Sequence, residues 1–245
     1  TWPAMGTLLH ASARAPDGGA AEEAVEAARA RVLAVDSLMS TYRPESDLSR
    51  VNRAAGRQTA VRVSAETAAV LREALRWARL TGGAFDPTAG PLARAWGFHQ
   101  GEPRFPDPAA RDSAVRLVGW GRVELRETEP AVRLPEEGMR LDLGALAKGH
   151  ALDQAVEAMR ARGATAGMVD LGGNLRVFGS PPGGGHGPDG GQRGQTESRE
   201  VWNAGTVYGW RLGVRHPRRD GGLLGTLSLD SGSVATSGDA EQFFE

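Results

Sequence analysis

Residues 141–149 read LDLGALAKG, a run in which a predicted strand ends, the chain turns and a helix begins. The first turn of a helix offers free backbone N–H groups and a partial positive charge, to which Lys148 adds a full one. This combination suits a phosphate group, and Asp142 is placed to meet a ligand hydroxyl, a ring nitrogen or hydrated magnesium. An ordinary strand-to-helix turn with a surface lysine explains the same residues. The run lacks the G-x-x-x-x-G-K-[ST] pattern of a Walker loop.

Three helices are predicted by apolar side chains that recur every three or four residues. The first covers residues 21–40, and the second covers residues 65–80 after a Ser64 cap. The third runs from about Ala147 to Arg162, with Gly163 placed to end it. The inward-facing residues are expected to be Val25, Ala28, Val32, Val35 and Met39 in the first helix, Val70, Ala74, Trp77 and Ala78 in the second, and Leu152, Ala155, Val156 and Met159 in the third.

Short strand-like pieces outnumber these helices. Their predicted ranges are 61–63, 115–118, 123–125, 131–134, 139–143, 168–171, 175–178, 208–215 and 224–229. Regular alternation of strand and helix, and the all-parallel sheet that it builds, are therefore not expected. The sequence predicts an α+β fold, a single domain of mostly antiparallel strands with helices packed on the sheets.

The composition bounds the classes of function. The 245 residues carry 29 Lys or Arg and 30 Asp or Glu, a formal net charge of -1, so no basic excess indicates nucleic acid or anionic lipid as a partner. The absence of cysteine excludes disulfides, thiolate nucleophiles and cysteine-bound metal, which leaves oxygen and imidazole as metal ligands. No apolar run approaches the roughly 20 residues that span a bilayer.

One segment has the composition of a loop. Residues 179–205 read GSPPGGGHGPDGGQRGQTESREVWNAG and contain almost no aliphatic side chains. Such a segment cannot bury enough apolar surface to offset the entropy lost when it is ordered. We expect a mobile surface loop within one domain, because patterned sequence resumes after it.

A second candidate site lies in residues 81–92, which read TGGAFDPTAGPL. The glycines tolerate left-handed backbone, the prolines stiffen the loop, and Phe85 and Asp86 place an apolar face beside a carboxylate. This suits a planar polar ring, although a helix end followed by a proline-stiffened loop explains the same residues. Further along, residues 168–174 predict a tight hairpin or a turn where a ligand approaches bare backbone, and residues 229–239 predict a Ser/Gly turn or a phosphate-binding nest.

The remaining chemistry-bearing residues give weak signals. Residues 5–7 (MGT) and 39–42 (MSTY) read as core or turn residues when taken alone. The five histidines are scattered, and none has a partner at metal-ligand spacing. The patterns G-x-S-x-G, H-E-x-x-H and G-x-G-x-x-G do not occur, which argues against serine hydrolases, zinc peptidases and Rossmann domains.

Taken together and in this order, these segments resemble the FAD:protein FMN transferase family, the ApbE type. The resemblance covers nearly the whole chain. Its motifs are M-G-T at residues 5–7, M-S-T-Y at 39–42, G-G-A-F-D-P-T-A-G-P-L at 82–92, W-G-F at 96–98, V-G-W at 118–120, D-L-G-A-L-A-K-G at 142–149, V-D-L-G-G-N at 169–174, W-R-L-G-V-R-H-P at 210–217 and V-A-T-S-G-D at 234–239.

The resemblance implies an enzyme that binds FAD and Mg²⁺ and moves the FMN half of FAD, through its phosphate, onto a threonine or serine hydroxyl of an acceptor protein. By their places in the motifs, the residues expected to line the flavin nucleotide are Met5, Tyr42, Ala84, Phe85, Asp86, Asp142 and Lys148. The backbone carbonyl of Ala145 is the expected magnesium ligand. Some relatives hydrolyse FAD to FMN and AMP, which gives an alternative activity.

The chain departs from the family pattern in two places. The family's histidine-bearing segment, with the expected general base, and a stretch with further magnesium ligands are expected beyond Glu245, in a missing C-terminal part of the family domain. If the protein naturally ends at Glu245, a non-catalytic flavin-binding protein is the alternative. The long glycine-rich loop is the second departure. The resemblance also implies an exported protein, periplasmic or on the outer face of the cytoplasmic membrane, with or without a lipid anchor.

Overall fold

The computed structural model describes residues 1–98, 103–181, 209–218 and 222–237. Its largest sheet has five strands in the order β1-β2-β6-β7-β10, and each neighbouring pair is antiparallel. The strands are β1 (Trp2–Ala4), β2 (Thr7–Arg14), β6 (Ala166–Leu171), β7 (Asn174–Phe178) and β10 (Gly232–Ala235).

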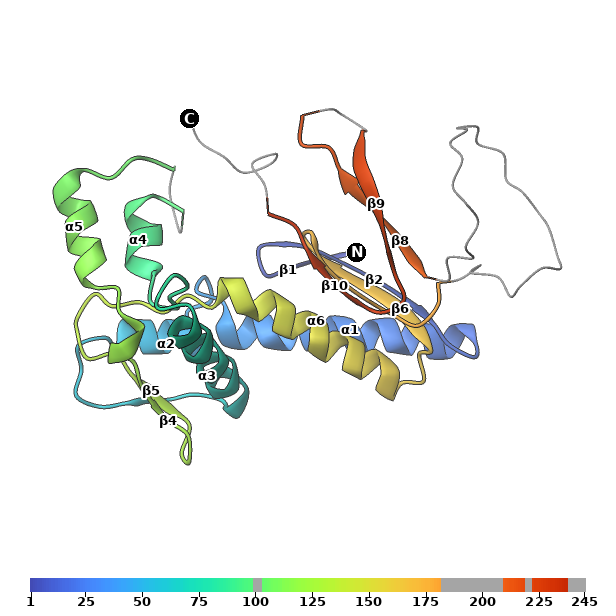
Figure 1. The fold of residues 1–245 in the computed structure, drawn as a ribbon. Helices are drawn as coiled ribbons and strands as arrows, with labels where there is room; N and C mark the ends of the chain where they lie inside the picture. The colour runs from blue at the N-terminus through green and yellow to red at the C-terminus, as the bar shows by residue number, and fades with distance from the viewer. Residues whose placement is uncertain (99–102, 182–208, 219–221, 238–245) are drawn as a thin grey trace.

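Two long helices cover one face of this sheet, as Figure 1 shows. They are α1 (Gly18–Met39) and α6 (Gly144–Ala161), which also pack against each other. The Asp17 side chain caps α1 by accepting a hydrogen bond from the Ala20 N–H at 2.9 Å. Each helix buries the residues of one stripe, because apolar side chains three and four positions apart share a face.

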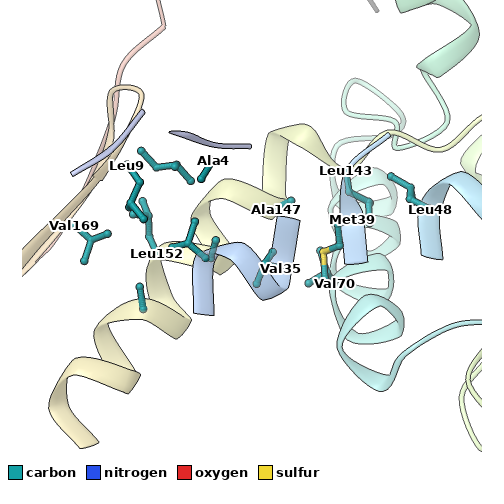
Figure 2. Packing of buried hydrophobic residues seen from close by; sticks show 14 of the residues in the cluster. Ala4, Leu9, Val35, Met39, Leu48, Val70, Leu143, Ala147, Leu152 and Val169 are labelled. Carbon is teal, nitrogen blue, oxygen red and sulfur yellow. The ribbon is translucent and has the colours of Figure 1, made fainter. Parts of the chain in front are cut away.

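The core runs from the sheet to the beginning of α6 (Figure 2). At the sheet end, Leu9 of β2 and Val169 of β6 are fully buried beside Leu152 of α6. At the other end, Leu143 and Ala147 are buried in the same cluster. The turn that enters α6 is therefore anchored on its inner side by the main core.

The other elements gather mainly where α6 begins (Figure 1). They are α2 (Asp47–Arg53), α3 (Ala65–Leu80), α4 (Gly90–Ala95), α5 (Pro108–Arg116), the 3-10 helix η1 (Trp120–Arg122) and an antiparallel sheet of β3 (Val61–Arg62), β5 (Ala131–Arg133) and β4 (Glu124–Arg126). A separate hairpin pairs β8 (Trp210–Arg215) with β9 (Leu223–Leu229). Its Trp210 Nε1 donates to the Gly179 carbonyl at 2.8 Å.

The predicted α+β class is confirmed, and so are the three predicted helices, within three residues at each end. Both predicted ends of α3 agree with the structure. The Ser64 side chain caps the first end as predicted, accepting from the Thr67 N–H at 3.0 Å. The hairpin predicted at residues 168–174 is also confirmed. Gly172 and Gly173 form its turn with φ of +60° and +83°, a conformation in which glycine avoids the strain of a side chain.

Three predictions about local structure are wrong. Residues 115–118 are not a strand, because Asp107 and Pro108 start a helix that continues to Arg116. Residues 139–143 join no sheet, since only an isolated bridge between Ala89 and Arg140 forms there. Trp77 does not face the core: it is 45% exposed, while the neighbouring Ala74 and Ala78 are fully buried.

Two further observations concern the rest of the chain. The glycine-rich segment predicted as a mobile loop, 179–205, lies almost wholly outside the described residues, which stop at residue 181 there. Within the described ranges, the helices are too short or too polar for any of them to cross a membrane.

Candidate functional site

The two segments singled out from the sequence lie side by side. The Asp142 N–H donates to the Pro87 carbonyl at 2.8 Å, and Ala89 bridges to Arg140 in parallel. Gly90 approaches so closely that an added Cβ would lie 2.8 Å from the Arg140 Cβ. A side chain at residue 90 would therefore force the segments apart. The loop at residues 81–92 and the run at 141–149 form one site.

A buried amide holds the second segment in place. The Asn52 Nδ2 donates to the Leu141 carbonyl at 2.9 Å, and the Leu141 N–H donates to the Asn52 Oδ1 at 2.7 Å. Asn52 is 6% exposed. These two bonds replace a partner strand and fix the backbone one residue before Asp142. Sequence reasoning missed Asn52, because nothing in its local pattern indicates a partner so far along the chain.

Asp142 stabilises the turn that leads into α6, whose N-cap residue is Leu143. Its Oδ1 accepts a hydrogen bond from the Gly144 N–H at 2.7 Å, and the Leu143 carbonyl accepts from the Ala147 N–H at 2.8 Å. One carboxylate oxygen of Asp142 is thus already used at the start of α6. Asp142 therefore stabilises the turn whether or not it also contacts a ligand.

Lys148 lies in the same helix start and is half-buried. No carboxylate of the described residues forms an ion pair with it. Of the 29 basic residues in the sequence, Lys148 alone is a lysine. An ammonium is a compact point charge with rotatable donors, unlike the planar guanidinium used everywhere else in this chain. This compositional signal is visible in the sequence alone.

Asp86 stabilises the loop at residues 81–92 through hydrogen bonds. Its Oδ1 accepts from the Thr88 N–H at 2.7 Å and from the Thr88 hydroxyl at 2.6 Å, and its Oδ2 accepts from the Trp120 N–H at 3.0 Å. The Thr88 Oγ1 in turn accepts from the Gly119 N–H at 2.7 Å. Within the protein, the Asp86 carboxylate therefore joins the loop to η1.

A small apolar hollow opens where these segments meet. Its volume is about 220 Å³, and its lining residues are Trp77, Phe85, Ala145 and Leu146. Phe85 and Ala145 are predicted site residues, and the structure brings them together. Trp77 and Leu146 were missed as site residues, Trp77 because the helical period placed it among core residues. The Phe85 N–H donates to the Thr81 hydroxyl at 3.1 Å, which holds the loop against the end of α3.

The other predicted residues do not line this hollow. Met5 sits in the turn between β1 and β2, half-buried against the core, with a positive φ of 49° that is unusual for a residue with a long side chain. Tyr42 follows α1 and is 60% exposed, and Ala84 is exposed in the loop before Phe85. The structure therefore brings together the two segments that carry Phe85, Asp86, Asp142, Ala145 and Lys148, and the roles of all the predicted site residues stay predictions.

A second, larger hollow shares no predicted residue. It measures about 420 Å³ and is lined by Arg50, Arg53, Ala54, Arg57 and Val61, and we call it the arginine hollow. Two of its cations bind within the protein, since Arg50 forms an ion pair with Asp47 and Arg53 donates to the Pro44 carbonyl at 2.5 Å.

Asp47 itself is part of a buried network. Burial alone would raise the pKa of its carboxyl, but hydrogen bonds from Ser64 and Thr67 and the contact with Arg50 outweigh burial and lower that pKa.

The described residues contain no group of three His, Asp or Glu side chains that could hold a metal ion. Ala145 is exposed in the first turn of α6, and a peptide carbonyl has two lone pairs, so its oxygen can serve as one ligand. The residues present fit a single ligand position for Mg²⁺ and not a complete site.

Comparison with known proteins identifies the fold's relatives. The ApbE family model matches residues 5–245. The FAD:protein FMN transferase of Treponema pallidum is 32% identical over 216 residues, which are 86% of this chain and 55% of that protein. The enzyme of the same name from Haemophilus influenzae is 28% identical over 250 residues, 98% of this chain and 65% of that one. The chain thus spans a little over half to two thirds of the length of these relatives.

Solved structures give the same result. The ApbE protein of Thermotoga maritima has a TM-score of 0.79 and 29% identity, covering 99% of this chain and 70% of that one. The flavin transferase ApbE of Vibrio cholerae has a TM-score of 0.76 and 25% identity, covering 100% of this chain and 72% of that one.

Proposed function

This chain belongs to the ApbE family, and from that membership we propose that it acts in FAD:protein FMN transfer. The reaction moves the FMN half of FAD onto a threonine or serine hydroxyl of an acceptor protein. The observation that carries the proposal is that the small hollow of Phe85 and Trp77 is also lined by the first turn of α6, the helix that carries Lys148. The names of the relatives from Treponema pallidum and Haemophilus influenzae support it.

The geometry suits the two chemically different parts of a flavin dinucleotide. Trp77 and Phe85 offer flat apolar faces of the kind that stack on a ring system. Lys148 and the start of α6 offer positive charge, which favours phosphate groups. A hollow of about 220 Å³ is too small for a whole dinucleotide, so we propose that it holds one ring while the phosphates lie along the turn.

The proposed transfer balances without any redox step. The acceptor hydroxyl oxygen forms a new ester bond to the phosphorus of FMN, and the bond from that phosphorus to the bridging oxygen breaks. AMP leaves with the bridging oxygen, and the hydroxyl proton is released. Negative charge grows on the leaving phosphate, and we propose that the half-buried Lys148 ammonium stabilises it.

We propose that the reaction also requires Mg²⁺, with the Ala145 carbonyl as one ligand. Mg²⁺ commonly keeps several waters and binds one or two protein oxygens together with substrate phosphates, which is compatible with a single ligand in this part of the chain. When bound, the ion would neutralise phosphate charge. Chelation by EDTA should abolish transfer, and added Mg²⁺ should restore it.

The decisive test is covalent labelling of an acceptor. The full-length protein is incubated with FAD, Mg²⁺ and an acceptor domain that a known FAD:protein FMN transferase modifies, and the acceptor is analysed for flavin fluorescence after denaturing electrophoresis. A fluorescent band and an FMN mass on a Thr or Ser are expected. No label on that acceptor would contradict the proposal, and release of free FMN without acceptor would identify an FAD hydrolase instead.

A second test locates the site without any catalysis. Because Lys148 is the single lysine of the chain, an amine-reactive reagent can modify only this side chain, and mass spectrometry of its peptide measures the extent. FAD should slow the modification, whereas riboflavin, which lacks phosphate, should protect less. Equal modification with and without saturating FAD would contradict phosphate binding at this turn.

We also propose that the protein is exported, to the periplasm or the outer face of the cytoplasmic membrane. Cell fractionation with antibody detection would test this, and recovery in the cytosolic fraction alone would contradict it.

A further inference from the structure

Arg140 shares a face with Asp142 beside the candidate site. Along residues 139–143, Met139, Leu141 and Leu143 are buried, whereas Arg140 and Asp142 between them are half-exposed. This alternation is that of an extended chain, in which every second side chain points to the same side. The Arg140 side chain therefore leaves the segment on the same side as Asp142, whose carboxylate accepts from the first residue of α6.

Arg140 also has an incomplete set of partners. Its Nε is buried and makes no hydrogen bond to any part of the chain that the structure describes. In those ranges, no carboxylate forms an ion pair with its guanidinium either. A buried donor without a partner costs free energy that a bound acceptor would recover.

A second arginine lies close to the first. Gly90 touches the Arg140 backbone, and Arg94 follows Gly90 by four residues in α4, so the two share a face of that helix. Burial lowers the pKa of Arg140, and the positive charge of Arg94 lowers it further, while Asp142 opposes both. Two guanidinium groups near one another repel each other, and an anion bound between them offsets this repulsion. Arg94 has no ion-pair partner within the described ranges.

We propose that Arg94 and Arg140 form a phosphate-binding subsite beside Asp142, which takes a phosphate of the nucleotide substrate. The identity of the nucleotide rests on the proposed function, whereas the preference for a phosphate rests on the two cations alone. A guanidinium binds a phosphate through two parallel N–H bonds, and a pair of guanidinium groups matches the two negative charges of a dinucleotide's pyrophosphate. The arginine hollow differs, because Arg50 and Arg53 already bind groups of the protein.

Calorimetric binding separates this subsite from the rest of the site. FAD, ADP, riboflavin and inorganic phosphate are titrated into the wild type, Arg140→Gln, Arg94→Gln and the control Arg57→Gln, which removes the same charge from the arginine hollow. Loss of a hydrogen bond to a charged group should weaken FAD and ADP binding about tenfold in both site variants. Riboflavin binding should not change, and Arg57→Gln should behave as wild type.

The outcomes distinguish the two proposals. Unchanged FAD and ADP affinity in both site variants would overturn the subsite, and a loss confined to inorganic phosphate would overturn its assignment to a nucleotide. If the wild type binds FAD but transfers no FMN, the proposed function fails and the subsite stands. Circular dichroism verifies folding, and should Arg140→Gln unfold, Arg140→Lys keeps the charge and loses the paired N–H donors, so weaker ADP binding is again expected.

Discussion

Two hollows of the described structure differ in what their charged neighbours bind. The arginine hollow is nearly twice as large, about 420 Å³ against about 220 Å³, but Arg50 and Arg53 there are held by Asp47 and by the Pro44 carbonyl. Beside the small hollow, the Asp86 and Asp142 carboxylates both accept hydrogen bonds from backbone N–H groups. Lys148, in contrast, has no carboxylate partner among the described residues. Two of the three arginines that line the larger hollow are thus bound within the protein, whereas the one ammonium beside the small hollow has no carboxylate partner in the part of the chain that the structure describes.

The strongest test of this difference removes one cation from each region. Lys148→Met should lower the rate of FMN transfer by roughly 100- to 1000-fold, because charge on the leaving phosphate loses its stabilising ammonium. The matched control Arg57→Met removes a cation from the arginine hollow and should leave the rate within about twofold of wild type. Initial rates of acceptor labelling at saturating FAD measure both. Equal losses in the two variants would show that net charge matters and the location does not.

Helix α2 serves both regions, since Arg50 and Arg53 line the arginine hollow while Asn52 holds the Leu141 backbone. Asn52→Ala removes both buried hydrogen bonds and should lower the free energy of unfolding by about 2 to 4 kcal/mol. Urea denaturation measures the loss. The control Asn174→Ala, whose amide makes one bond of 3.5 Å, should lose much less. A small change at Asn52 would mean that other contacts position the turn.

The sequence predicts the framework of this site better than its contacts. α1, α3 and α6 follow from the spacing of apolar residues, and the hairpin at Gly172 and Gly173 follows from turn chemistry. β2 escaped prediction because its more buried positions hold Thr7, Leu9, Ala11 and Ala13, so a strict alternation of burial is not matched by an alternation of large apolar residues. Residues 81–92 and 141–149 were identified separately, and only the fold shows that they touch. The Asn52 side chain bonds the backbone of Leu141, 89 positions along the chain, and no local sequence pattern indicates so distant a pair.

Trp77 tests the aromatic wall of the small hollow. Trp77→Ala should weaken FAD binding by about five- to tenfold, since stacking on an aromatic ring contributes about 1 kcal/mol. Leu80→Ala, another exposed apolar residue near the end of α3, lies outside the lining and should bind FAD as wild type does. Flavin fluorescence titration gives both affinities. If both variants bind equally well, the ring lies elsewhere and the hollow is not its place.

The smallest expected effect concerns Asp47, the carboxylate that pairs with Arg50 at the arginine hollow. Hydrogen bonds from Ser64 and Thr67 and the contact with Arg50 lower the pKa of Asp47 below its ordinary value of 3.8 despite burial. A carboxyl with a depressed pKa in the folded state contributes stability above its unfolded pKa, and this contribution is lost as the pH falls through the lower, folded value. The free energy of unfolding should therefore decline below about pH 4, with this one group adding at most about 1.4 kcal/mol per pH unit to the slope.

Urea titrations between pH 2 and 6 measure the slope, which should be shallower in Asp47→Asn and unchanged in the exposed control Asp112→Asn. If Asp47→Asn keeps the wild-type slope, the network of Ser64, Thr67 and Arg50 does not favour the charged form of Asp47, and the difference between the two hollows loses its support.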